Sequence, residues 1–228
     1  LGVGFDDSSL ELWPLVTNRA PFSARTTVAF HPDGESVFTV RDQQGLFLTS
    51  LVGGGERRIL LPPLNQDPLL SDPVGERVFV VRSDPWRGVI ARVRDGVTLA
   101  TIPNLPRRVT ASDWSADGRR IALANGEPPY TITLYDTETG EEQARFVEHL
   151  MPVRKLHFHP ASDSFVAVSG GHDLIWRSVE AGGFRVGIPA SARALEFSRD
   201  GTRLGYSPGD GELGLLEAPH RSAGRIPT

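Results

Sequence analysis

Cysteine is absent from the 228 residues, so disulfide bonds, thiolate metal ligands and cysteine nucleophiles are excluded. Long apolar runs are absent as well, because no stretch approaches the roughly 20 consecutive apolar residues that a membrane-spanning helix needs. We therefore expect no membrane partner. The lack of cysteine leaves the compartment open: we expect a cytoplasmic protein, with an extracytoplasmic location as the alternative.

Lysine is nearly absent, since Lys155 is the one lysine among 24 basic residues. Arginine in place of lysine is typical of a GC-rich coding sequence, and we expect a bacterial protein. The formal net charge is −4, which is small for a chain of this length. A charge of this sign and size does not favour binding to nucleic acid, so no nucleic-acid partner is expected.

A repeated pattern organises the residues that are present. Each copy has an apolar strand that ends in a large residue, a polar turn, and a second apolar strand. In the first copy the turn is His31-Pro32-Asp33-Gly34 and the second strand covers residues 37–40. The large residues of the five copies are spaced by 40, 44, 44 and 39 residues: Phe30, Leu70, Trp114, Phe158 and Phe197. A period this steady predicts a repeat architecture.

The length of the repeat indicates its structure. Roughly 40 residues hold four strands of ordinary length with tight turns between them, and runs of Val, Ile, Phe and Leu between turn residues form antiparallel hairpins. One such sheet cannot cover both of its apolar faces, so neighbouring sheets must pack radially against it. No segment shows a sustained helical period. We therefore predict an all-β β-propeller with about five to six four-stranded blades.

The repeat resembles the WD40 repeat, in which strand a ends in a Phe-Ser-Pro-Asp-Gly-like turn and strand c ends in Trp-Asp. Here strand c ends in Trp13, in Tyr135-Asp136 and in Trp176. The WD40 network of His, Ser or Thr, Asp and Trp is matched in part by Asp7 and Trp13, by His149, Ser169 and Trp176, and by Asp210, whose Trp position is Leu216. No repeat carries the full set, which indicates divergent blades held mainly by apolar packing. The resemblance implies a non-catalytic protein-interaction scaffold that needs no cofactor.

Residues 1–228 are predicted to form a single WD40-like β-propeller segment. Residues 1–13 hold strands equivalent to b and c of a blade without its strand a, and five further units follow. We therefore expect a partial ring, a piece of a larger ring or of a longer protein, and favour an arc over a nearly closed six-bladed ring. The resemblance also suggests fusion to a regulatory domain, such as a kinase, outside this segment.

The sequence has no Gly-x-Ser-x-Gly nucleophile elbow and no phosphate-binding loop, since residues 53–55 are followed by neither a helix nor a lysine. His157 and His159 have the spacing of two zinc ligands on one strand face. However, His159 occupies the turn position that Ser115 fills in another copy, as His31 does. We therefore predict no catalytic residue, no metal site and no cofactor.

Three polar residues, Asp113, His157 and Glu196, share a register next to the strand-a anchors. In propellers strand a lines the central channel, so we expect these groups to be solvated there. Binding of an ion at this row would instead make the chain a propeller enzyme or a small-ligand or metal-binding propeller, lactonase-like or peptidase-associated. That is the alternative function.

Two b–c turns are longer than the others and carry aromatic residues, Trp86 beside Arg87 in one and Tyr130 in the other. In WD40-like propellers the b–c turns share a rim with the d–a connections, which here include Arg107-Arg108 and residues 149–152. Aromatic side chains beside arginine are typical of binding hot spots. We predict a site for a protein partner with an acidic, partly apolar surface at Trp86, Arg87, Arg107, Arg108 and Tyr130. The alternative is that Trp86 packs onto its own blade.

Overall fold

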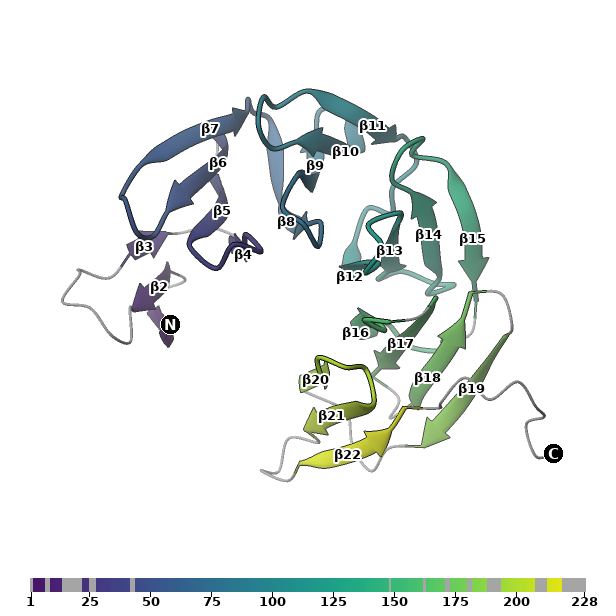
Figure 1. Cartoon of the computed structure of the whole chain (residues 1–228). Coiled ribbons are helices and arrows are strands. Elements are labelled where there is room, and N and C mark those ends of the chain that lie inside the picture. The colour runs from purple at the N-terminus through teal and green to yellow at the C-terminus, as the bar shows by residue number, and fades with distance from the viewer. Residues whose placement is uncertain are drawn as a thin grey trace. The chain divides into compact units, whose positions relative to one another are not determined.

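The computed structural model describes residues 2–6, 9–13, 22–24, 28–41, 44–147, 149–161, 163–170, 173–179, 182–187, 194–207 and 213–218. Every regular element in these ranges is a β-strand, and the strands pair into antiparallel sheets (Figure 1). Within these ranges no helix is long and apolar enough to cross a membrane. The predicted all-β class is confirmed.

The chain divides into two compact units, of which the first contains residues 1–105 and 136–141. It holds one three-stranded and two four-stranded sheets. Their strands are β1 (Gly2–Asp6), β2 (Ser9–Trp13) and β3 (Phe22–Ala24); β4 (Val28–Phe30), β5 (Ser36–Arg41), β6 (Gly45–Ser50) and β7 (Glu56–Leu60); and β8 (Leu64–Ser71), β9 (Arg77–Ser83), β10 (Trp86–Arg92) and β11 (Thr98–Ile102).

The second unit contains residues 106–135 and 142–228. It holds two four-stranded sheets and one three-stranded sheet. Their strands are β12 (Val109–Trp114), β13 (Arg120–Asn125), β14 (Ile132–Asp136) and β15 (Glu142–Phe146); β16 (Val153–Phe158), β17 (Ser164–Ser169), β18 (Asp173–Ser178) and β19 (Gly182–Gly187); and β20 (Ala194–Phe197), β21 (Arg203–Ser207) and β22 (Gly214–Glu217). Consecutive strands are neighbours in every sheet, as short connections favour.

The five predicted anchors lie on the first strand of their sheets, but one of them is out of register. Phe30 pairs with Val37 across the first hairpin, seven positions along. In the next sheet the equivalent pair is Ser71 with Val78, and Leu70 pairs with Phe79 instead. The assignment of Leu70 was therefore wrong by one residue. In this repeat the small residue Ser71 fills the anchor position. The sequence pattern, which follows large side chains, therefore pointed to the adjacent Leu70, whose side chain lies on the other face of the strand.

Apolar side chains of the second strands fill the core of each unit. Residues 78–81 of β9 and 164–169 of β17 are buried throughout rather than at alternate positions. Sheets packed on both faces give such continuous apolar runs. In the first unit Phe38 packs with Val78 and Val80 of the next sheet, and in the second unit Phe165 packs with Leu134 of the preceding sheet.

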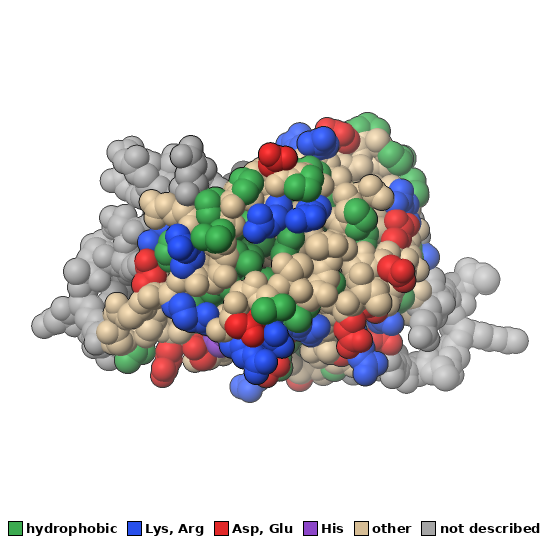
Figure 2. All heavy atoms as spheres, turned by 90° about the horizontal axis from the view of Figure 1, so that it is seen from above, with side chains coloured by type: hydrophobic (Ala, Val, Ile, Leu, Met, Phe, Trp, Pro, Cys, Tyr) green, Lys and Arg blue, Asp and Glu red, His purple; other side chains and the backbone are tan. Residues whose placement is uncertain are grey.

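Large apolar side chains are also exposed, mostly in turns, connections and edge strands. On the face in Figure 2 the basic side chains lie in groups beside acidic ones, with hydrophobic side chains between them. The exposed ones among the described residues are Phe30, Val52, Leu61, Val74, Val97, Leu99, Val147, Leu150, Met151, Leu213 and Leu215. These positions are the first candidates for contacts with other molecules.

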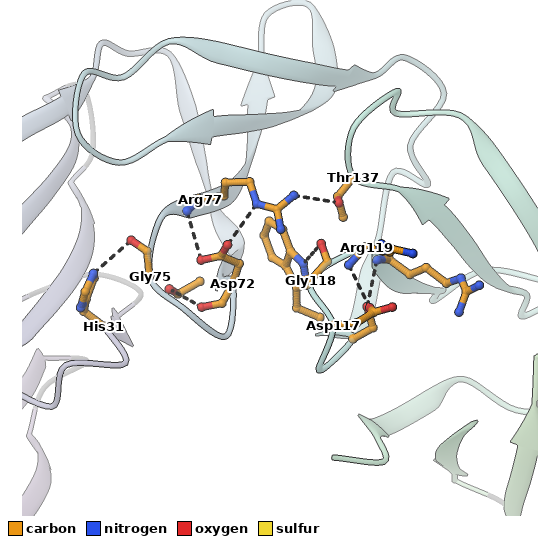
Figure 3. A network of polar contacts seen from close by, with 12 residues as sticks. His31, Asp72, Gly75, Arg77, Asp117, Gly118, Arg119 and Thr137 are labelled. Atoms are coloured by element: carbon orange, nitrogen blue, oxygen red, sulfur yellow. Dashed lines mark hydrogen bonds and ion pairs between the residues drawn. The ribbon is translucent and has the colours of Figure 1, made fainter. Parts of the chain in front are cut away.

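Polar contacts join the neighbouring sheets of the first unit (Figure 3). The Nε2–H of His31, in the β4–β5 turn, donates to the carbonyl oxygen of Gly75 in the β8–β9 turn at 3.1 Å. The Asp72 side chain is fully buried and forms an ion pair with Arg77 Nε at 3.0 Å. Arg77 Nη1 in turn donates at 3.0 Å to Thr137 Oγ1, in the segment 136–141 that belongs to the first unit. The a–b turns therefore contribute to packing between blades as well as to the hairpins themselves.

The second unit has equivalent contacts. His159 Nε2–H donates to the carbonyl oxygen of Gly201 in the β20–β21 turn at 2.9 Å. Between the two preceding sheets, Arg120 Nη1 lies 3.2 Å from Asp163 Oδ1. Two of these contacts between sheets thus use a histidine at the first position of the a–b turn, whereas Ser115 at the same position makes its contacts within its own turn.

Candidate functional site

The β9–β10 hairpin carries the rim residues of the first unit. Trp86 is the first residue of β10 and pairs with Ser83, and Arg87 pairs with Arg82. The prediction of a long b–c turn was therefore wrong here: β9 ends at Ser83, and only residues 84–85 separate it from β10. Both Trp86 and Arg87 are half-buried. Arg82 Nη2 donates to the carbonyl oxygen of Leu61, in the β7–β8 connection, at 3.3 Å. In this unit a b–c turn and a d–a connection therefore do lie at the same end of the sheets, as the sequence predicts.

The β13–β14 loop carries Tyr130 in the second unit. The backbone N–H of Tyr130 donates to the carbonyl oxygen of Glu127 at 2.9 Å, which closes the loop on itself. Tyr130 has a φ of +49°, a left-handed conformation that is rare for a bulky residue and costs about 1–3 kcal/mol. Its side chain is half-buried. The loop is therefore held in one shape by its own backbone hydrogen bonds rather than by a regular strand.

Arg108 lies against this loop. The backbone N–H of Gly126 donates to the carbonyl oxygen of Arg108 at 2.7 Å. A Cβ on Gly126 would come within 2.9 Å of Arg108 Cγ and Cδ, so the arginine side chain passes directly over the glycine. Arg107 and Arg108 are both exposed. The structure thus brings Arg108 and the Tyr130 loop together.

The five predicted partner-binding residues fall into two groups, each within one unit. Trp86 and Arg87 belong to the first unit, and Arg107, Arg108 and Tyr130 belong to the second. Each group stands at the end of the sheets where b–c turns meet d–a connections. The prediction that these residues bind a partner stays a prediction.

The β15–β16 connection adds apolar surface to the second group. Leu150 is 81% exposed and Val147 is 61% exposed. The connection follows Phe146, which pairs with Ile132 directly after the Tyr130 loop, and Gly170 N–H donates to the Pro152 carbonyl oxygen at 3.3 Å. The sequence placed residues 149–152 on this rim but carried no sign that Leu150 is exposed, because an apolar residue is by itself a signal for burial.

Asp113, His157 and the backbone of Phe158 form the polar row on the first strands of the second unit. Asp113 Oδ2 accepts a hydrogen bond from Phe158 N–H at 2.7 Å, and Oδ1 accepts one from Trp114 N–H at 2.9 Å. His157 Nδ1 lies 3.7 Å from Asp113 Oδ2. Asp113 therefore links strand β12 to strand β16 in addition to facing the histidine.

The electrostatics of this row favour the neutral form of Asp113. Burial raises the pKa of the Asp113 carboxyl, the Phe158 N–H, His157 and the Trp114 N–H lower it, and the charge of Glu196 raises it further. Burial is the largest of these effects. The predicted shared register of Asp113, His157 and Glu196 thus places His157 next to Asp113, and the charge of Glu196 close enough to raise the Asp113 pKa.

Nothing in the described part of the chain assembles three or more His, Cys, Asp or Glu side chains around a metal-sized site. His157 and His159 do not share a strand face, because β16 ends at Phe158 and His159 begins the turn. The ring of His159 instead points to Gly201 of the next sheet. His149, Ser169 and Trp176, the partial WD40-like set, are all buried in or beside sheet β16–β19, whereas Asp7 and Asp210 lie outside the described residues.

Successive antiparallel sheets of up to four strands, repeated about every 40 residues, define a WD40-like β-propeller fold. The solved structure of U3-55K, a WD40 propeller protein, is similar to this chain with a TM-score of 0.68 at 12% sequence identity. The match covers 84% of this chain and 60% of the U3-55K chain. No family model and no curated protein matches the sequence. The likeness establishes the fold.

Proposed function

We propose that the chain is a non-catalytic protein-interaction scaffold whose partner binds at the rim formed by the b–c turns and the d–a connections. WD40 propellers commonly bind proteins, which supports the class of function. The observation that carries the proposal is the exposure of Leu150 and Val147 in the same unit as Arg108 and Tyr130. Exposed apolar side chains at the same end of the sheets as exposed arginines suit a partner surface that is acidic and partly apolar.

Transfer of a leucine side chain from water into an interface contributes about 1.5–3 kcal/mol. Exposed arginines contribute less to affinity, but they accelerate encounter with an acidic surface and disfavour basic ones. Leu150 would therefore anchor the partner, and Arg107 and Arg108 would orient it. The five predicted residues are retained as parts of this rim: Trp86, Arg87, Arg107, Arg108 and Tyr130.

The experiment compares partner capture by two matched variants. Leu150→Asp places a charge on the proposed rim, and Val74→Asp places the same charge on an exposed turn residue of the β8–β9 hairpin, at the end of its own sheet opposite the b–c turn. Proteins captured by the wild-type chain and by Val74→Asp but lost from Leu150→Asp are candidate partners. Titration calorimetry with a purified candidate then gives the change in affinity.

Both variants should keep the wild-type melting temperature, because both side chains are exposed. The proposal predicts at least tenfold weaker binding of the candidate to Leu150→Asp, which corresponds to about 1.4 kcal/mol. Equal binding by all three proteins would contradict the rim as the interaction surface. Equal loss of binding in both variants would contradict it too, since the control does not touch the rim.

A further inference from the structure

A cavity of about 460 Å³ lies in the first unit, at the end of sheet β8–β11 opposite the Trp86 hairpin. One wall comes from β7, and the other comes from the β8–β9 and β10–β11 turns. The lining residues are Arg57, Gly75, Glu76, Arg92, Val93 and Arg94. Half of them are arginines, although the chain as a whole has a net negative charge.

The backbone holds the walls of this cavity close together. Gly96 has a φ of +71°, and a Cβ there would lie 2.1 Å from the carbonyl oxygen of Ile59, so the β10–β11 turn rests directly on β7. Arg57 Nη1 donates to the carbonyl oxygen of Arg94 at 3.0 Å. The guanidinium of Arg57 is therefore fixed beside the turn that carries Arg92 and Arg94, which lowers the entropy cost of binding a ligand.

The charges around the cavity are not balanced. Asp95 forms ion pairs with two arginines: its Oδ1 lies 3.0 Å from Arg92 Nε, and its Oδ2 lies 3.4 Å from Arg94 Nε. The hydrogen bond from Arg92 holds the pKa of Asp95 below its ordinary value, so this carboxylate is ionised at neutral pH. Among the described residues Arg57 has no carboxylate partner, and Arg94 is 76% exposed. With Glu76 as the other acidic group, positive charge is in excess.

We propose that this cavity binds a dianionic phosphoryl group, a phosphate monoester or inorganic phosphate, through Arg57 and Arg94. The planar guanidinium fork matches the oxygen geometry of a phosphoryl group and forms charge-assisted hydrogen bonds with two oxygens at once. A dianion gains more from the arginines than a monoanionic diester does, and it has to overcome repulsion by two carboxylates, Glu76 in the lining and Asp95 beside Arg92 and Arg94. The remaining volume accommodates the group that carries the phosphate.

This site does not rest on the proposed rim, since within the first unit the cavity and the Trp86 hairpin lie at opposite ends of sheet β8–β11. Binding is measured by titration calorimetry at low ionic strength, where exposed charges are least screened. The probes are inorganic phosphate, N-acetylphosphoserine methylamide, its unphosphorylated serine counterpart, and dimethyl phosphate. Both phosphate-bearing dianions should bind saturably, and the serine compound and the diester should bind more weakly or not at all.

The ranking of the two dianions identifies the source of the phosphate. Tighter binding of the phosphoserine compound supports a phosphorylated side chain of a partner, and tighter binding of inorganic phosphate supports the free ion. Either ranking agrees with a phosphoryl site. Absence of saturable binding by both, or equal binding of dimethyl phosphate, overturns the proposal.

Substitution of single residues in and beside the cavity tests whether phosphate binds there. Arg57→Ala and Arg94→Ala should each weaken phosphate binding about tenfold, the effect of losing one charge-assisted hydrogen bond. Glu76→Gln should strengthen it, because one repelling carboxylate is removed. Arg58→Ala is the matched control: Arg58 is exposed on the same strand but does not line the cavity.

Arg94→Ala decides the outcome if Arg57→Ala is unstable, because it keeps the carbonyl oxygen that Arg57 contacts and removes only an exposed side chain. Melting temperatures measured by circular dichroism verify that each variant is folded. Phosphate binding that is equal in the wild type, Arg57→Ala and Arg94→Ala would overturn the assignment, as would a loss of equal size in Arg58→Ala.

Discussion

The imidazole of His159 lies directly on Gly201 of the next sheet. Its Nε2–H donates to the Gly201 carbonyl oxygen at 2.9 Å, and its Nδ1 accepts from the backbone N–H of Ala161 at 3.0 Å. His31 and Gly75 repeat the contact in the first unit. In each case the histidine needs a neighbour without a Cβ, so a His at this turn position and a Gly in the following repeat belong together.

Gly201→Ala should destabilise the protein more than an ordinary turn substitution. Gly201 has a φ of +71°, and an alanine Cβ would come within 2.5 Å of His159 Cε1. The left-handed conformation alone costs an alanine about 1–2 kcal/mol, and displacement of the His159 ring adds the loss of a hydrogen bond, about 0.5–1.5 kcal/mol. Urea denaturation of the variant and the wild type measures the difference.

Gly34→Ala is the matched control for this substitution. Gly34 holds the same turn position with a φ of +70°, but no atom lies within 4 Å of the point that an alanine Cβ would occupy. It should therefore show the conformational cost without the cost of displacing a histidine. If the two variants lose the same stability, the His159–Gly201 contact contributes nothing to the joint between these sheets.

The a–b turns show how far the sequence determines such contacts. The period near 40 residues predicted the sheets and the turns, because the hairpin pattern is local. The turn histidines were correctly placed as turn residues, but their acceptors lie 44 and 42 residues away in the sequence. The sequence of one repeat does not specify how that repeat packs on the next. The contacts between sheets could therefore be predicted only from the co-occurrence of His31 with Gly75 and of His159 with Gly201.

The residues of the rim also show which features the sequence predicts and which depend on the packing of the fold. Trp86 and Tyr130 were recognised because aromatic residues stand out in segments that have the composition of long turns. Of the two segments, the one with Tyr130 is a long loop between Asn125 and Ile132, whereas Trp86 is part of strand β10. The exposure of Leu150 could not be predicted, since apolar composition alone favours burial and the fold decides which connections are covered. The shift from Leu70 to Ser71 has a similar cause: the position is set by strand register, whereas the sequence pattern follows side-chain size.

Asp113 should titrate above the ordinary aspartate value of 3.8, because burial raises its pKa. An acid with a raised pKa binds more protons when folded than when unfolded. The free energy of unfolding that it contributes is therefore highest below pH 3.8 and decreases as the pH rises through its raised pKa. Carbon-detected NMR of the Asp113 carboxyl measures the midpoint directly.

The same effect is visible in the variant Asp113→Asn. The stability of the wild type minus that of the variant should fall as the pH rises through the raised pKa, since asparagine does not titrate. Carboxylates that do not interact with Asp113 cancel in this difference, whereas the titrations of Glu196 and His157, which interact with it, contribute to it. A midpoint at or below the ordinary value, or a difference that rises with pH, would show that the hydrogen bonds from Phe158 and Trp114 outweigh burial.

Asp200 should behave in the opposite way. The hydrogen bond from Ser198 Oγ, followed by those from Thr202, lowers the pKa of Asp200 from 3.8 to about 2. Its stabilising effect is present above pH 3.8 and is lost as the pH falls through about 2. Asp200→Asn should thus be less stable than the wild type at neutral pH, and the gap should close in acid. A gap that is independent of pH would point to a purely steric effect of the substitution.

Trp86→Ala tests the rim of the first unit independently of Leu150. Trp86 is half-buried at the start of β10, so part of its side chain is exposed. Loss of an aromatic anchor at the centre of an interface costs about 2 kcal/mol or more of binding free energy. We therefore expect weaker binding of the partner identified with Leu150→Asp, at an unchanged melting temperature. A lower melting temperature with unchanged binding would mean that Trp86 serves the packing of its own blade, and the first-unit rim would then have no part in recognition.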